Sequence, residues 1–138
     1  MNEADLPVGL PPSLDDLAQL AEAAFQSLPE DIRQQVGEIV FRVDDFPAPE
    51  ILAEMGIADP FELTGLYHGA PIGQQSILDP LPEPSRIFLY RRPLLDEWVD
   101  RGDIPLSALI NHVLVHEIGH HFGLSDQDID RLEAAADA

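Results

Sequence analysis

The sequence predicts a single domain that contains both helices and strands. Its 138 residues are enough for one domain of ordinary size and too few for two. Segments that alternate apolar and polar residues, as strands do, lie in the middle of the chain, and amphipathic helical patterns lie toward both ends. Residues 1–12 hold three prolines and no periodic pattern. We therefore expect a flexible lead-in over residues 1–12 and one domain over residues 13–138.

The first half of the chain predicts three helices and a strand. Ser13 is a good N-cap for a helix with leucines and alanines at helical spacing. Pro29 and Pro49 each suit the first turn of a short helix, and Gly56 suits the end of one. Pro47 ends the strand-like run before it. The expected elements are helices at about 13–28, 29–36 and 49–56 and a strand at 38–46.

The second half predicts two strands and three helices. The expected strands cover 63–69 and 86–91, and the expected helices cover 93–101, 105–122 and a stretch that begins after Ser125. Gly65 weakens the first of these strands, and RIFLYR at 86–91 is the strongest strand signal in the chain. Residues 70–85 hold four prolines and form a long loop, which in compact domains is often functional. Asp128 is a weak capping-box partner for Ser125.

The charge of the chain restricts its partners. The formal net charge is −19, with no lysine and seven arginines, so nucleic acid and anionic membrane surfaces are not expected partners. The acidity favours either simple solubility or a preference for basic substrates. The N-terminus has no basic or apolar region of a secretory signal, and no apolar run has transmembrane length. We expect a cytoplasmic protein, plausibly a monomer.

The segment HEIGHHFGLSD, residues 116–126, carries the chemistry that the sequence predicts. His116 and His120 are four residues apart and therefore project from one face of a helix, where both imidazoles can bind one metal ion. With no cysteine in the chain, any metal must be held by His, Asp or Glu. Asp126 supplies a third candidate ligand, and Gly123 allows the chain to leave the helix sharply. These ligands favour Zn²⁺ and leave its fourth position open to water.

Glu117 lies between the two histidines, where it can act as a general base. Zinc lowers the pKa of a bound water to roughly 7, and a carboxylate can take the water's proton and pass it to a leaving amine. Glu117 could instead be a structural carboxylate in a site without turnover. Both histidines could also be buried core residues. The motif favours hydrolysis of a peptide, or of another small amide by the same residues.

The other acidic and histidine candidates remain open alternatives. An acidic residue at position 126 is favoured by the helix dipole whether or not it binds metal, and Asp128 and Asp130 are weaker ligand candidates. His121 faces about 100° away from its neighbour at 120. His112, one turn before His116, either lines the cleft or packs beside it.

Two further residues, Tyr67 and His68, lie on a predicted strand or in the turn after it. The Tyr67 phenol could stabilise an oxyanion, although core packing is the simpler expectation.

The chain resembles the short bacterial minimal zincin-like metallopeptidases. The resemblance rests on HEIGHHFGLSD, together with VDDFP at 43–47, LTGLYHGAP at 63–71 and IFLYRRPLL at 87–95, and extends from about Leu28 to Glu133. It implies a compact zincin-like α+β fold with a small mixed β-sheet packed beside the HExxH helix. It also implies zinc held by His116, His120 and Asp126, with Glu117 as the base.

The longer motif is also similar to that of the metzincins, with two departures. An aspartate stands where metzincins place a histidine, and both methionines, Met1 and Met55, precede the motif, so a methionine turn has no counterpart.

The function that the resemblance implies is hydrolysis of a peptide or protein substrate. The alternative is a zinc-binding regulatory or interaction module without turnover. In zincins an edge strand pairs with the substrate, and we expect the strand near 86–91 to have this role.

Overall fold

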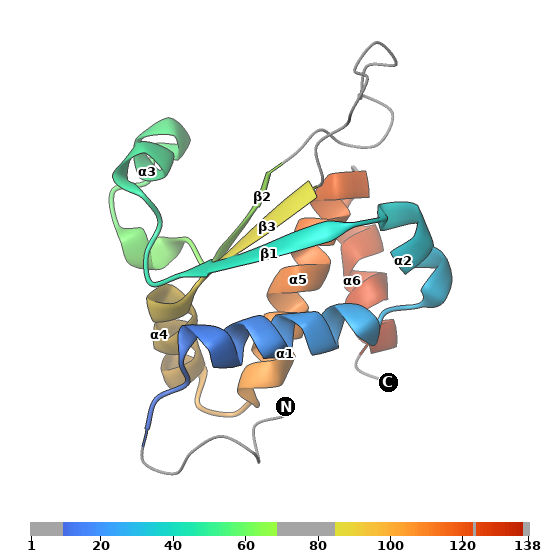
Figure 1. Ribbon diagram of the computed structural model, residues 1–138, viewed down its shortest axis with the longest axis horizontal. Coiled ribbons are helices and arrows are strands. Elements are labelled where there is room, and N and C mark those ends of the chain that lie inside the picture. Colours follow the sequence, from blue (N-terminus) through green and yellow to red (C-terminus); the bar gives the residue numbers. More distant parts are fainter. Residues whose placement is uncertain (1–9, 69–84, 123, 137–138) are drawn as a thin grey trace.

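The computed structural model describes residues 10–68, 85–122 and 124–136. Within these ranges the side chains of residues 120–122, 126, 128, 131, 135 and 136 lie outside the description. The predicted lead-in at 1–12 and loop at 70–85 therefore fall mostly outside the described residues. The described part is an α+β fold, as predicted: helices cover one face of a small mixed sheet (Figure 1).

Three strands of the described part of the chain form the sheet, in the order β1-β3-β2. They are β1 (Ile39–Asp44), β2 (Gly65–His68) and β3 (Ser85–Tyr90), with β1 parallel and β2 antiparallel to β3. The expectation that the strand near 86–91 is an edge that pairs with substrate is wrong. Strand β3 is central, and its neighbours use the hydrogen bonds on both of its sides. The edge that faces the motif helix belongs to β2.

Side chains alternate between the two faces of the sheet. Ile87 and Leu89 of β3 are fully buried and point toward the helices, and Phe41 of β1 meets Phe25 of the first helix edge to face. The apolar residues of RIFLYR suit the centre of the sheet, because strands flank β3 on both sides and the helical layer covers Ile87 and Leu89.

Helix α5 (Leu106–Phe122) lies beneath the sheet and forms the centre of the core. Its first three turns bury Leu106, Leu109, Ile110 and Leu114 completely. Helices α1 (Leu14–Gln26), α6 (Asp126–Ala136), α4 (Arg91–Arg101) and α2 (Glu30–Val36) surround it. The ends of α1, α2, α4 and α5 and the start of α6 agree with the predicted ones to within two residues. The motif helix is thus held on several sides, which restricts movement of the side chains it carries.

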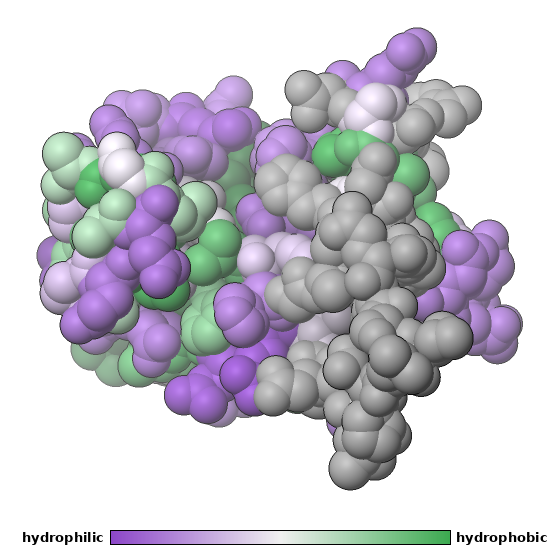
Figure 2. Space-filling model, turned by 90° about the horizontal axis from the view of Figure 1, so that it is seen from above, coloured by the Kyte–Doolittle hydropathy of each residue, from purple (hydrophilic) through white to green (hydrophobic). Residues whose placement is uncertain are grey.

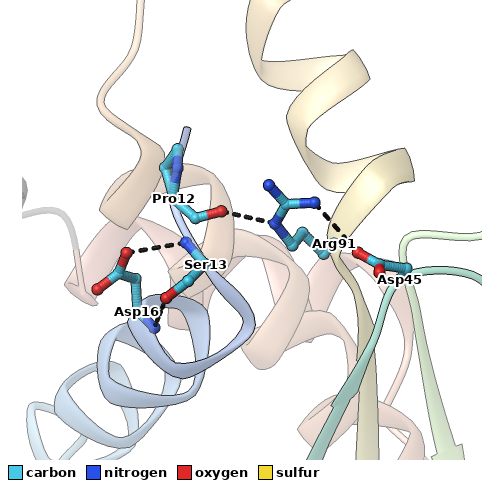
Figure 3. A network of polar contacts seen from close by, with 5 residues as sticks. All are labelled: Pro12, Ser13, Asp16, Asp45 and Arg91. Carbon is cyan, nitrogen blue, oxygen red and sulfur yellow. Dashed lines mark hydrogen bonds and ion pairs between the residues drawn. The ribbon is translucent and has the colours of Figure 1, made fainter. Parts of the chain in front are cut away.

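The start of α1 is fixed by a capping box and by an arginine from a distant segment (Figure 3). The Ser13 hydroxyl accepts from the N–H of Asp16, and the Asp16 carboxylate accepts from the N–H of Ser13. Arg91 donates through Nε to the carbonyl of Pro12 at 2.6 Å and through Nη1 to Asp45 at 3.1 Å. It thereby joins α1, the end of β1 and the start of α4.

Helix α3 (Pro49–Met55) and the short 3₁₀ helix η2 (Pro60–Glu62) connect β1 to β2. Gly56 ends α3 in the left-handed conformation, as predicted. Helix α3 has no buried residue and stands apart from the helical layer (Figure 1). Among the described residues, no helix is both long and apolar enough to cross a bilayer.

Candidate active site

Helix α5 brings the first two motif residues to the rim of the core. His116 is partly buried, and Glu117 is only 8% exposed. The helix continues without interruption to Phe122, so His120 lies one turn after His116 on the same helix. The side chain of His120 is outside the described residues, so its role as a metal ligand remains a prediction.

His116 and Glu117 line one pocket of about 180 Å³. The pocket is bounded by α5, by α4 and by the residue that precedes β2. Its other lining residues are Thr64, Glu97, Arg101, His112 and Val113. The wall from α4 carries an ion pair, with Arg101 Nε 3.4 Å from Glu97 Oε2. Imidazole, carboxylate and guanidinium groups therefore meet around a space large enough for a small part of a substrate.

Glu117 is held by the main chain of the edge strand. Its Oε2 accepts a hydrogen bond of 2.8 Å from the N–H of Tyr67. The N–H of Tyr90 donates to the carbonyl of Thr64, so alternate residues of β2 face β3 and the main-chain groups of Tyr67 face away from it. The Glu117 carboxylate thus accepts a hydrogen bond from a main-chain N–H of β2 that points away from β3.

Gly65 lets the motif helix approach β2 closely. A Cβ atom at this position would lie 2.8 Å from Val113 Cγ1 and 3.2 Å from the carbonyl oxygen of Phe88. The glycine that weakens the strand signal in the sequence is therefore needed for packing. Because β2 lies directly against α5, the N–H of Tyr67 is within reach of Glu117.

The C-terminal end of α5 is closed by the chain that leads to α6. The N–H of Leu124 donates to the carbonyl of Gly119 at 2.8 Å and so satisfies one carbonyl of the last helical turn. Gly119 also lies against Ile129 of α6, where a Cβ atom would collide with the Ile129 side chain. Gly123 and the side chain of Asp126 lie outside the described residues. Their predicted roles, as turn and as third ligand, remain predictions.

His112 lies both at the pocket and against α6. It lines the pocket, and its Nδ1 is 3.0 Å from Oε1 of Glu133. Of the two alternatives from the sequence, the structure therefore supports the one in which His112 lines the cleft. The pair joins the motif helix to α6, the helix that begins at Asp126.

The phenol of Tyr90 lies close enough to the Asp44 and Glu117 carboxylates for their charges to change its pKa. Burial raises the pKa of Tyr90, and the nearby carboxylates of Asp44 and Glu117 raise this pKa further. Tyr90 is at the end of β3, and its phenol stays protonated at neutral pH.

The remaining predicted candidates have less direct positions. Tyr67 packs partly buried against the core, which supports core packing for its ring. His68 is exposed and meets the ring of Phe88 edge-on. Asp130 is exposed on α6. The side chains of His121 and Asp128 are outside the described residues.

Sequence reasoning missed three parts of the site. The main-chain N–H of Tyr67 leaves no trace in a sequence motif, because every residue but proline carries one. Thr64 and the Glu97–Arg101 pair lie far from HExxH in the chain. Glu97 and Arg101 are four residues apart, a spacing that predicts an ion pair on a helix. Only the packing of α4 on α5 brings this pair to the pocket.

A small mixed sheet above a helix that carries HExxH fits the zincin class of metallohydrolases. A family model for zincin-like metallopeptidases matches residues 36–136, which is well over half of the chain. The chain belongs to this family. A search among curated proteins finds no match.

Proposed function

We propose that the protein is a zinc-dependent metallopeptidase in which Glu117 is the general base. One observation carries the proposal: His116 and the nearly buried Glu117 line the same pocket. The family supports peptide or protein as the substrate class. The pocket adds an open space beside the two motif side chains, which hydrolysis of a substrate requires.

The donors of the chain suit zinc. His116 and His120 supply imidazole nitrogens, Asp126 supplies a carboxylate, and the chain offers no thiolate. His116 fits this assignment because it is partly exposed and faces a pocket. When bound, zinc acidifies water and polarises the scissile carbonyl.

Glu117 moves the proton. Its hydrogen bond from the N–H of Tyr67 fixes the direction of the side chain. From that position Glu117 accepts a proton from the attacking water and returns it to the amine that leaves. Cleavage of the amide bond then gives one carboxylate and one amine.

Two measurements test the metal site and the reaction. The wild-type protein should bind zinc, and His116→Ala, His120→Ala and Asp126→Ala should each weaken zinc affinity by at least tenfold. Asp130→Asn, at an exposed carboxylate of α6 and a weaker ligand candidate, serves as the control for Asp126. Unchanged affinity in Asp126→Ala would move the third ligand elsewhere.

The wild-type protein should also cleave members of a diverse peptide library. Zinc binding without cleavage would favour the alternative function, a zinc-binding module that does not turn over. Cleavage of small amides but not of peptides would narrow the substrate class instead.

A further inference from the structure

The segment between β1 and β2 forms an acidic lobe, which we define as residues 46–62. It comprises α3 and η2 and carries four acidic side chains, Glu50, Glu54, Asp59 and Glu62, with no lysine, arginine or histidine. All four side chains are exposed. Among the described residues, no side chain forms an ion pair with the three glutamates.

The acidic lobe also exposes large apolar side chains. Phe46, Met55 and Phe61 are 37%, 45% and 39% exposed, and α3 has no buried residue. Apolar residues gather on this lobe, at the left of Figure 2, beside hydrophilic ones. A seven-residue helix gains most of its stability from packing of an apolar face, and the described part of the chain buries no residue of α3. An apolar surface rimmed by charge is typical of an interaction site.

One arginine side chain of the same chain already contacts the lobe. The rings of Phe46 and Phe61 meet edge to face at 5.2 Å, and the guanidinium of Arg92 lies 5.7 Å from the centre of the Phe46 ring. This cation–π contact comes from α4 of the same chain. The aromatic pair and its acidic surroundings therefore suit basic side chains with apolar neighbours.

The acidic lobe leads directly to the catalytic pocket. Glu62 is its last residue, Leu63 is buried, and Thr64 lines the pocket with His116 and Glu117. Two residues span at most about 7 Å of extended chain. Helix η2 also packs on α4, which supplies the pocket wall. A peptide bound on the lobe can thus extend into the pocket without a long gap.

We infer that the acidic lobe docks a basic, apolar segment of the substrate beside the bond to be cleaved. The inference rests on the proposed function for naming that segment as part of a substrate. Charge complementarity selects the occupant: a second copy of this chain would bring a net charge of −19 against the same acidic surface. Anionic lipid and nucleic acid are repelled for the same reason.

Binding can be measured apart from cleavage, using full-length Glu117→Gln protein. The probe is a fluorescent 15-residue peptide of alternating arginine and leucine. Two comparison peptides replace its arginines by glutamate or its leucines by serine. We expect the arginine–leucine peptide to bind at low salt and both comparison peptides to bind at least tenfold more weakly. Equal binding of the serine peptide would overturn the apolar part of the surface.

Matched variants locate the bound peptide. Glu50→Gln, Glu54→Gln and Glu62→Gln together should raise Kd at least tenfold. The control combines Glu22→Gln, Glu30→Gln and Glu38→Gln, which remove the same charge from exposed positions outside the lobe and should raise Kd less than threefold. Phe61→Ser should weaken binding about tenfold, whereas Leu14→Ser, at an equally exposed position, should not. Equal effects of the two triple variants, or no binding to the unaltered lobe, would overturn the inference.

Cleavage then tests the link to the substrate. Joining the arginine–leucine segment to a cleavable peptide should lower KM at least tenfold in the wild type and not in the lobe triple variant, with kcat little changed. If the wild type cleaves no peptide, the proposed function fails while lobe binding stands. If it cleaves peptides but the segment does not lower KM, the docking inference fails and the proposed function stands.

Discussion

The N–H of Tyr67 donates a 2.8 Å hydrogen bond to Oε2 of Glu117, and so links the edge of the sheet to the motif helix. Fifty residues separate the two in sequence. Because Glu117 is only 8% exposed, loss of this donor would leave a mostly buried carboxylate oxygen with one hydrogen bond fewer. The sheet therefore orients the Glu117 carboxylate, which we propose as the base, as well as contributing to the core.

Removal of the Tyr67 N–H should lower kcat, because this N–H orients the Glu117 carboxylate. Tyr67→Pro deletes the donor, whereas Tyr67→Phe keeps it and removes only the phenol. We expect Tyr67→Pro to lower kcat at least tenfold and the free energy of unfolding by about 1–3 kcal/mol, with zinc content unchanged. Tyr67→Phe should keep most of the activity. Steady-state kinetics and urea unfolding check both variants. Full activity of both variants would show that the hydrogen bond has no role, and an equal loss in both would assign the role to the phenol, which both variants lack.

The close packing of α5 on α6 should reverse the sign of the effect that Gly119→Ala has on the free energy of unfolding, depending on whether Ile129 is present. In an ordinary helix, glycine to alanine gains about 1 kcal/mol, but overpacking costs about 1–3 kcal/mol. Gly119→Ala should therefore destabilise the wild type, because the new methyl group meets Ile129. In an Ile129→Ala background the same change should stabilise the protein by up to about 1 kcal/mol. Urea unfolding of all four proteins measures the coupling. The same effect of Gly119→Ala in both backgrounds would mean that the two side chains do not meet.

Arg91 should stabilise the fold more than its ion pair alone does. Its side chain is 17% exposed and donates to both Pro12 and Asp45, whereas Asp45 is 54% exposed. An exposed ion pair contributes under about 1 kcal/mol, and hydrogen bonds from a charged donor contribute about 1.5–3 kcal/mol. We expect Arg91→Ala to cost about 2 kcal/mol and Asp45→Asn under about 0.5 kcal/mol in thermal or urea unfolding. A larger loss in Asp45→Asn would contradict this order.

Tyr90 gives the site an optical probe at alkaline pH. The chain has two tyrosines, so in Tyr67→Phe only Tyr90 titrates near 295 nm. Burial first, and then Asp44 and Glu117, raise its pKa, so the midpoint should lie above that of free tyrosine. Asp44→Asn should lower it. The folded protein keeps a proton that the unfolded chain gives up, so this contribution to stability is present below the ordinary tyrosine pKa and is lost as pH rises through the folded pKa. A midpoint at the ordinary value would contradict the burial of the phenol.

The parts of the fold that depend on local pattern were predictable from the sequence. Ser13, Pro49 and Gly56 marked helix ends correctly, because capping and left-handed turns are set by single residues. The α5 helix followed from its dense apolar residues, and HExxH located His116 and Glu117. The α+β class and the zincin-like family are confirmed.

What the sequence did not indicate depends on contacts between distant segments. The order of the strands placed β3 at the centre, although a single strong strand signal is equally compatible with an edge. Gly65 weakens the strand pattern in the sequence, and its need for space arises only from Val113 on a distant helix. Arg101 reaches the pocket because α4 packs on α5, which no spacing along the chain encodes.

The central claim, that Glu117 performs the chemistry of a metallopeptidase, is tested most directly by one comparison of turnover at equal zinc content. Glu117→Gln keeps the size of the side chain and removes its basicity, and Glu97→Gln makes the same change at another carboxylate of the same pocket. With zinc measured in each sample, kcat for a cleaved peptide should fall at least a hundredfold in Glu117→Gln and less than threefold in Glu97→Gln. Equal turnover by wild type and Glu117→Gln with zinc bound would contradict the claim.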